Sequence, residues 1–472
     1  MTRPRHSLAR RAAATVRVAA RTRIERSVPY RSPEAIERLQ QRRLRAIVTH
    51  AYEAVPFYRE QMRRKGLRPT DIGSARDLLR LPLIDAELVR SDPERFASEA
   101  VPSEERETAF SSGTDSALPG AVYWDRGTVL RELITAERDR GVITRMAGEG
   151  RLSAFGRELV GPRWRRLPFA GDANGDSSHR RISFFPNDMN SRTMRRIWAG
   201  YTLIPARSAH HHFFSPTLPL DEAAAHIGEL RPRVVFSFGS FADQFLRYLE
   251  HGGIELDLPR VWVYGGDMAS EEASEIAQRR GLRLFSVYSA VETGRLGFQC
   301  EQGAGHHLNV DLTAVRIADD SGVDVPAGRE GDILVSNLTN RATVLLNYRL
   351  GDRGTLASKR CPCGRGLPLL QELRGRRSDL VRMANGREVA LLVVKGLFRA
   401  QLKRVLQAQL VQEGEGQLRW RIVPAPGTDP EGLERSFRSR ALEVLADTRL
   451  EVEMTPSIGR TPRGKFQELV RA

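Results

Sequence analysis

The sequence predicts an α/β protein: a large N-terminal domain with mainly parallel sheets flanked by helices and a β-rich subdomain, followed by a small α+β domain. Apolar runs at Arg233–Gly239, Arg260–Gly265 and Leu282–Tyr288 alternate with helical stretches at 241–251 and 270–280. Strand, helix and strand at this spacing are typical of βαβ units, whose strands pair in parallel. Strand patterns without helices follow after residue 310, and the last hundred residues return to a mixed pattern.

The N-terminal region, residues 1–100, is expected to be mainly helical. Residues 32–66 show apolar residues near helical spacing, Ser32 is a candidate N-cap, and Pro56 interrupts the pattern. The β-rich part is predicted to contain strands at 313–318, 331–338 and 343–348. The C-terminal unit is predicted to contain, in order, a helix at 391–412, a strand at 418–423, a helix at 430–446 and a strand at 450–454.

Composition excludes several classes of protein. The net charge is +16 and the pI is 10.4, but only five of the 74 cations are lysine, and the arginines are dispersed rather than interleaved with aromatics. This pattern is typical of a GC-rich genome, and we expect no nucleic-acid partner. No apolar run approaches the ~20 residues of a membrane span. Arg17 and Arg21 interrupt the apolar stretches of the basic N-terminus, so no continuous signal-peptide core is expected.

All three cysteines lie within 64 residues, at Cys300, Cys361 and Cys363, with His306 and His307 between them. Three thiolates and one imidazole form the ligand set of a closed, tetrahedral zinc site. A redox pair is the weaker alternative, because the C-x-C spacing differs from Cys-x-x-Cys and leaves Cys300 unexplained. An odd cysteine count without a signal favours a reducing compartment, and we expect a cytoplasmic protein. A second histidine group, 210–212, is interpreted as a loop or pocket lining.

Five segments carry residues suited to chemistry: Phe110–Gly120, Ser286–Gly294, Asn347–Asp352, Leu373–Asp379 and Gly459–Phe466. The first is rich in Ser, Thr and Gly, which present N–H and O–H donors to an anion, as phosphate-binding loops do. The second leads a strand into Glu292, and the third ends a strand at Asp352. The fourth is a polar junction, and the last places a rare lysine on a Gly/Pro-rich loop. Each alone has an ordinary structural reading.

In this order the five segments resemble the characteristic motifs of the adenylate-forming enzyme superfamily. His50–Tyr58, Gly305–Asp311 and Cys361–Arg365 further resemble phenylacetate–CoA ligase-like proteins, including those linked to capsule biosynthesis. The resemblance extends from about residue 33 to the C-terminus. It implies domains at 1–374 and 375–472, with a zinc site within 300–363 and a mobile C-terminal lid.

The resemblance implies a ligase that converts a carboxylic acid and ATP into an acyl-adenylate and then passes the acyl group to coenzyme A. Two alternatives stay open: transfer to an amine, a hydroxyl or a carrier-protein thiol, and a zinc-containing binding protein without catalysis. The family also makes a homodimer an expectation. The acid itself is not indicated, although Phe184, Phe185, Phe236 and Phe238 weakly favour an apolar or aromatic acyl group.

The resemblance also implies a role for each motif residue. Lys465 would bridge the carboxylate and the α-phosphate, and Glu292 would hold Mg²⁺. Tyr288 would stack on adenine, Asp352 would hold the ribose with Arg376 beside it, and Asp379 would belong to the hinge. The β- and γ-phosphates would be held by Ser111, Ser112, Gly113 and Thr114, and the adenine pocket would be lined by Gly265, Gly266 and Asp267. The zinc ligands would be Cys300, His307, Cys361 and Cys363, with His307 favoured over His306 by the family's Gly-x-His pattern.

One motif departs from the family. Where the phosphate loop usually continues Thr-Gly-Lys-Pro, this chain reads Asp115-Ser116-Ala117-Leu118-Pro119 after Thr114. The loop therefore lacks a cation and gains a negative charge, which predicts weaker binding of pyrophosphate. Retention of Lys465 in a chain with so few lysines favours an active enzyme.

Overall fold

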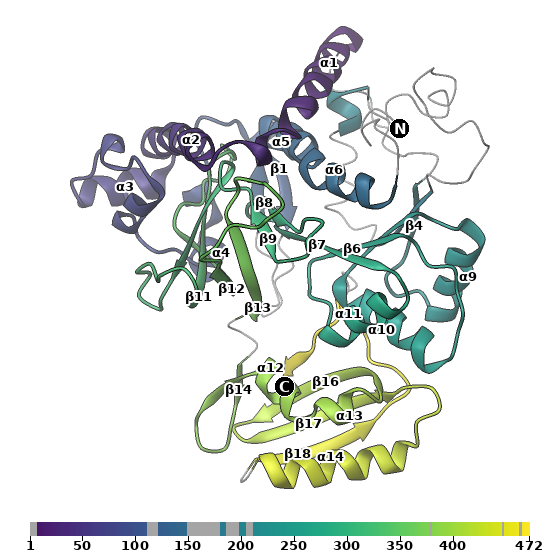
Figure 1. Cartoon of the computed structure of the whole chain (residues 1–472). Helices are drawn as coiled ribbons and strands as arrows, with labels where there is room; N and C mark the ends of the chain where they lie inside the picture. The colour runs from purple at the N-terminus through teal and green to yellow at the C-terminus, as the bar shows by residue number, and fades with distance from the viewer. Residues whose placement is uncertain are drawn as a thin grey trace, which may run out of the picture. The chain divides into compact units, whose positions relative to one another are not determined.

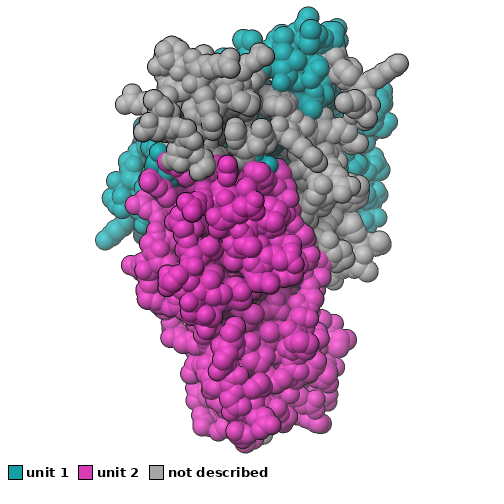
Figure 2. All heavy atoms as spheres, turned by 90° about the vertical axis from the view of Figure 1, so that its right-hand side faces the viewer, with its two compact units in different colours: residues 1–176, 187–211, 285–374 teal, residues 177–186, 212–284, 375–472 magenta. Residues whose placement is uncertain are grey.

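The structure, a computed structural model, describes residues 7–110, 121–148, 180–185, 198–203, 211–376, 380–445, 448–461 and 465–472 (Figure 1). It divides into two compact units, each assembled from three segments of the chain (Figure 2). Unit 1 comprises Met1–Asp176, Asn187–His211 and Phe285–Arg374, and unit 2 comprises Ser177–Pro186, His212–Leu284 and Gly375–Ala472. Within the described residues, no helix combines the length and the apolar character required to cross a membrane.

The N-terminal part of unit 1 is helical, as the sequence predicts. Ser32 caps α2, and Pro56 begins the separate helix α3 after Val55, which accounts for the predicted interruption. The helices are α1 (Leu8–Glu25), α2 (Pro33–Ala54), α3 (Pro56–Arg64), α4 (Ala86–Ser91), α5 (Arg126–Thr135) and α6 (Glu137–Met146), with 3-10 turns at Val28–Tyr30, Pro69–Asp71, Ala75–Arg80, Pro93–Phe96 and Ser103–Glu105.

Unit 1 also contains most of the β-rich part. Its strands follow the order β10-β11-β12-β13-β9-β8-β7, and the pairs β10–β11, β11–β12, β13–β9, β9–β8 and β8–β7 are antiparallel. The bounds are β7 (Arg283–Ala290), β8 (Gly294–Phe298), β9 (His306–Leu308), β10 (Thr313–Ala318), β11 (Glu330–Asn337), β12 (Tyr348–Leu356) and β13 (Leu369–Arg376), with a small separate pair β1 (Glu107–Phe110) and β2 (Ala121–Trp124). Residues of α2, α3 and these strands share one buried core.

The strand predicted at 343–348 is wrong for all but its last residue, because β12 begins only at Tyr348. Asn347 adopts a left-handed backbone conformation, with φ of 56°. Its buried side chain accepts a hydrogen bond from Arg316 (2.7 Å) and donates one to the carbonyl of Leu81 (3.2 Å). Asparagine tolerates this left-handed conformation, which is not that of a β-strand. The strand therefore begins only after Asn347, although the hydrophobic pattern predicts an earlier start.

The first part of unit 2 confirms the predicted βαβ units. Strands β3 (Arg181–Phe184), β5 (Val234–Ser237) and β6 (Val261–Gly265) pair in parallel, and β4 (His211–Phe214) follows β3 at the edge. The connecting helices are α9 (Leu220–Leu230), α10 (Gly239–His251) and α11 (Glu271–Arg279). Apolar faces of α10 and α11 and the strand residues form a second core that includes Phe241, Phe245 and Trp262.

The rest of unit 2 is the small α+β region. Its four-stranded sheet has the order β18-β17-β16-β19 and packs around Trp420 and Phe437. The bounds are β14 (Leu380–Arg382), β15 (Glu388–Ala390), α12 (Leu391–Leu397), α13 (Arg399–Leu402), β16 (Val405–Gly414), β17 (Gln417–Pro424), α14 (Pro430–Val444), β18 (Arg449–Met454) and β19 (Leu469–Arg471). The helix predicted over 391–412 is therefore wrong beyond Leu402, where β16 pairs with β17 on one side and β19 on the other.

Candidate active site and metal centre

Lys465 lies against the glycine turn that follows β6 in unit 2. Gly266 has a φ of 84°, and a Cβ built on it would lie 3.0 Å from the Phe238 ring and 3.5 Å from the Lys465 Cε. The positive φ favours glycine, and the close neighbours leave little room for a side chain. The structure thus brings together two predicted site residues that are separated by almost 200 positions in sequence.

The Asp267 side chain caps α10. One carboxylate oxygen accepts the Ser240 backbone N–H (3.0 Å) and the other accepts the Ser240 hydroxyl (2.7 Å). Burial raises the pKa of the Asp267 carboxyl, while the Ser240 donors and the charges of Lys465 and Arg460 act in the opposite direction. Asp267 is therefore a fixed carboxyl close to the Lys465 ammonium.

Arg460 is a site residue that the sequence analysis did not assign. It donates hydrogen bonds to Gln244 Oε1 (2.7 Å) and to the Ser240 hydroxyl (3.3 Å) and lies over the Phe241 ring. These contacts attach the loop bearing Lys465 to α10. Its position within the Gly459–Phe466 motif was the only signal in the sequence.

The lysine loop is also closed on itself. Thr461 N–H donates to the Lys465 carbonyl (2.8 Å), and Lys465 N–H donates to the Thr461 hydroxyl (3.1 Å). Hydrogen bonds at both the N–H and the carbonyl of Lys465 therefore fix the backbone from which its side chain extends.

In unit 1 the predicted nucleotide residues Tyr288 and Asp352 are in contact. The Tyr288 hydroxyl, on β7, donates to Asp352 Oδ2, on β12, at 2.8 Å. Tyr288 is mostly buried, and its ring lies 6.0 Å from that of His306. The hydrogen bond orients the carboxylate that was predicted to hold ribose hydroxyls.

Glu292 lies in the turn between β7 and β8, and its carbonyl accepts a hydrogen bond from the Asn337 amide (3.3 Å). Glu132 of α5 packs directly against this turn, so closely that a Cβ at Gly294 would overlap the Glu132 carboxylate. Gly294 has a φ of 76°, so only glycine fits both the backbone conformation and the space. Burial raises the pKa of Glu132 to about 7. Sequence reasoning missed Glu132, which carries no motif.

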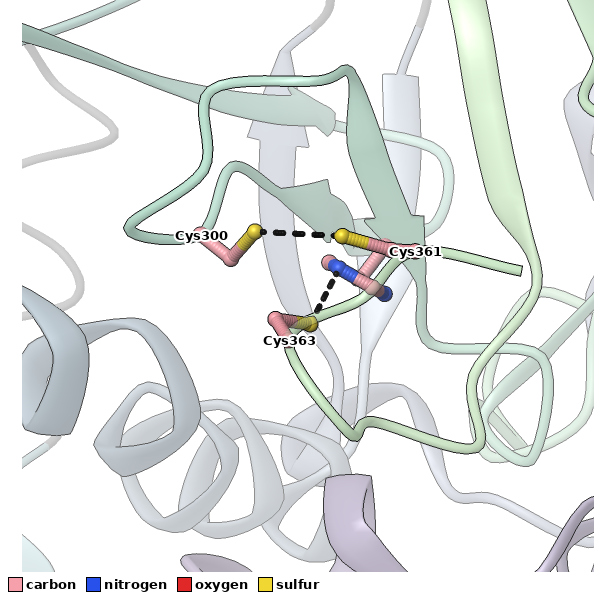
Figure 3. A group of neighbouring side chains, drawn as sticks. Cys300, Cys361 and Cys363 are labelled. Atoms are coloured by element: carbon pink, nitrogen blue, oxygen red, sulfur yellow. Dashed lines mark hydrogen bonds between the residues drawn. The ribbon is translucent and has the colours of Figure 1, made fainter. Parts of the chain in front are cut away.

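The predicted zinc ligands converge. The ligand atoms of Cys300, His307, Cys361 and Cys363 all lie within 4.8 Å of one another (Figure 3). Cys300 Sγ lies 3.7 Å from Cys361 Sγ, and Cys363 Sγ lies 3.2 Å from His307 Nε2. Two sulfurs bound to one tetrahedral zinc at 2.3 Å would lie about 3.8 Å apart, so the donor set and spacing fit this metal.

The histidine of this cluster is His307. Its other ring nitrogen, Nδ1, lies 3.4 Å from the Leu367 carbonyl, the second-shell contact that leaves Nε2 available for a metal. His307 and Leu369 are partners in the β9–β13 ladder. His306 points elsewhere, toward the Tyr288 ring. Among the residues described, this is the one cluster of potential metal ligands. The histidines at 211–212 lie in strand β4.

Several predicted residues lie outside the described parts: Ser111, Ser112, Gly113 and Thr114 with the altered stretch 115–119, His210, and Asp379. Arg376 ends β13, and only its backbone is described. Of the candidate pocket aromatics, Phe184 is fully buried and stacks on Phe241 at 4.6 Å, which makes it a core residue. Phe185 packs edge-on against Phe238 (4.9 Å).

Two curated relatives match most of the chain. Phenylacetate–coenzyme A ligase from Thermus thermophilus is 25% identical over 430 residues, which is 89% of this chain and 86% of that protein. The enzyme of the same name from Aromatoleum evansii is 23% identical over 449 residues, 92% of this chain and 86% of that protein. The chain is thus similar to phenylacetate–coenzyme A ligases over most of its length. No protein-family profile matches it.

The chain also has the fold of a solved CoA ligase. A crystal structure of 2-hydroxyisobutyryl-CoA ligase in the postadenylation state, in complex with an acyl-AMP, superposes with a TM-score of 0.64. The match covers 94% of this chain and 91% of that one at 16% identity. The predicted α/β fold is thereby confirmed.

Proposed function

We propose that the protein is an acid–CoA ligase that activates a carboxylic acid through an acyl-adenylate. The observation that carries the proposal is the position of Lys465 beside Gly266 and Asp267, in a homologue of phenylacetate–coenzyme A ligases. A cation held at a fixed place can stabilise negative charge that appears only in the transition state.

In the first step a carboxylate oxygen forms a bond to the α-phosphorus of ATP, and the bond from that phosphorus to the pyrophosphate oxygen breaks. The Lys465 ammonium would balance the charge on both reacting groups. Asp352, oriented by the Tyr288 hydroxyl, would accept hydrogen bonds from the ribose. Glu292 offers a carboxylate for Mg²⁺, an ion that would neutralise phosphate charge when bound.

In the second step the thiol of coenzyme A releases its proton to solvent, its sulfur bonds to the acyl carbon, and the bond from that carbon to the phosphate oxygen of AMP breaks. Lys465 has no task in this step, so we propose that residues 375–472 move about the junction at Arg376–Asp379. The contacts of this region with α10 would change in that motion. One of them is the Arg247 guanidinium, which donates to the Leu402 carbonyl (2.8 Å) and pairs with Glu272 (2.8 Å).

The Ser111–Thr114 loop would hold the β- and γ-phosphates, and Gly265 with Gly266 would line the adenine pocket. We also propose one structural zinc, bound by Cys300, His307, Cys361 and Cys363. Four protein ligands leave no open position, so the ion would bind neither substrate nor water. Thiolates persist in a reducing compartment, where we place the protein.

Exchange of labelled pyrophosphate into ATP, measured with a panel of carboxylic acids, tests the first step. Release of AMP after addition of coenzyme A, an amine or a carrier protein then identifies the acceptor. If no acid supports exchange and ATP does not bind, the enzymatic proposal is wrong and the binding-protein alternative stands.

A further inference from the structure

The outward face of α1 has an unusual composition. Five apolar residues at helical spacing point away from the protein and form what we call the apolar strip: Ala9, Ala13, Val16, Ala20 and Ile24. Val16 is 68% exposed and Ile24 is 44% exposed, whereas side chains of this type are normally buried. The strip therefore lacks a covering element within the described parts of the chain.

A row of arginines borders this strip. Arg10, Arg17 and Arg21 are separated by seven and four residues, so they lie along one edge of the helix and are exposed. Within the described residues no acidic side chain forms an ion pair with them, and α1 itself carries no acidic residue before Glu25. We call these three residues the arginine row.

The opposite face of α1 is firmly attached to unit 1. Val18 packs in a small core with Leu133, and the Arg11 guanidinium donates to the carbonyl of Ala199 (2.8 Å). At the C-terminal end, Glu25 forms a buried ion pair with Arg138 (2.6 Å). The helix is thus already anchored by one face, and its outward face is left for another partner.

Acidic residues on the elements packed against α1 do not offset the arginine row. Glu137 is buried and pairs with Arg26 (3.2 Å), and the buried Asp139 pairs with Arg295 (2.6 Å). Both carboxylates are paired inside unit 1, so they do not neutralise the arginine row. Both acids belong to α6, and Figure 1 shows α1 projecting above α5 and α6.

We propose that the outward face of α1 docks the protein on an anionic phospholipid surface. Basic residues next to an apolar strip on a surface helix suit the headgroup region, where cations meet lipid phosphates and apolar side chains enter the acyl boundary. A second copy of the chain fits less well, because two facing helices would bring arginine rows together without acids. A nucleic acid would leave the apolar strip against a charged backbone.

The test is sedimentation of the full-length protein with vesicles of phosphatidylcholine alone or mixed with phosphatidylglycerol, at low and at high NaCl. We expect binding only to the mixed vesicles, weakened by salt. The triple variant Arg10→Gln, Arg17→Gln, Arg21→Gln should bind about 100-fold more weakly, since each arginine contributes roughly five-fold. The matched control removes three exposed arginines elsewhere: Arg76→Gln, Arg329→Gln and Arg387→Gln.

The control variant should bind as the unmodified protein does. A second variant, Val16→Gln with Ile24→Gln, keeps the arginine row and should lower binding about ten-fold through the apolar term alone. Absence of binding to the mixed vesicles at low salt, or equal losses in the triple variant and its control, would overturn the proposal. So would equally strong, arginine-row-dependent binding to duplex DNA. Circular dichroism confirms that each variant is folded.

Discussion

The Lys465 side chain packs beside Gly266, so closely that a β-carbon on the glycine would approach the lysine Cε to 3.5 Å. The glycine turn and the C-terminal lysine loop are thus parts of one local structure in unit 2. Any substitution that disturbs either is expected to affect the first chemical step more than the second.

Replacement of Lys465 by alanine tests this directly. The variant should lose acid-dependent ATP–pyrophosphate exchange by about 10²–10³-fold, because one preorganised charge at the reacting phosphate is removed. Transfer from a chemically synthesised acyl-adenylate to coenzyme A should continue. Lys359→Ala, an exposed lysine of unit 1, is the control. An unchanged exchange rate in Lys465→Ala would remove our assignment of this residue.

Arg460→Gln should weaken the attachment of the lysine loop to α10. Loss of a hydrogen bond to a charged group corresponds to roughly 1.5–3 kcal/mol, so we expect the exchange rate to fall about 10- to 100-fold. The effect should lie in kcat rather than in the KM for ATP, since Arg460 positions the lysine. Arg435→Gln, at an exposed site in α14, should leave both constants unchanged. A change confined to KM would contradict a positioning role.

Cys361→Ser should abolish zinc binding, because a hydroxyl is a poor replacement for a thiolate ligand. Metal analysis should find about one zinc per chain in the unmodified protein and little in the variant. His306→Asn is the informative comparison, since His306 lies next to the cluster but outside it, and this variant should retain its zinc. Retention of zinc in Cys361→Ser, or its loss only in His306→Asn, would show that the ligand set is wrong.

Glu132 should make stability fall as pH rises. Its pKa in the folded chain is about 7, against an ordinary value of 4.5, because burial disfavours the charged form. Between these two values the folded protein retains a proton that the unfolded chain has released, so the free energy of unfolding decreases with pH. Glu132→Gln removes this dependence. Between pH 4.5 and pH 7, the free energy of unfolding of this variant should therefore rise by about 3 kcal/mol relative to that of the unmodified protein.

Urea unfolding at several pH values measures this difference, and Glu53→Gln, an exposed glutamate, is the control. Parallel pH profiles for Glu132→Gln and the unmodified protein would contradict the assignment. The same variant should alter ATP–pyrophosphate exchange only if the Gly294 turn moves, which separates a positioning effect from a purely energetic one.

Much of the fold could be predicted because local patterns coincide with buried surfaces. The apolar runs that become β5 and β6, and the amphipathic helices α10 and α11, are examples. The sequence of β16 misled because Leu, Gln and Ala favour helix, whereas pairing with strands on both sides decides its structure. Secondary-structure propensity depends only on the segment itself, so it cannot indicate that β16 will pair with β17 and with the distant β19.

The candidate site, too, could be predicted only in part. Lys465, Asp352 and the cysteines stand in recognisable motifs, and the structure shows which of them come together. The Asp267 cap on α10 and the Glu132 support under Gly294 depend on contacts between elements far apart in sequence. Such roles have no local sequence pattern, because a single Asp or Glu in the sequence does not indicate whether its side chain will be solvated or buried in a turn.

The two units alternate along the chain, and this has a consequence for synthesis on the ribosome. Unit 1 receives its last strands only when residue 374 has been made, and unit 2 waits for the final residues. Strand β9 is made well before its partner β13, because residues 309–368 lie between the two strands. During that interval the edge of β9 is unpaired, and an unpaired strand edge is where a nascent chain is most prone to aggregate.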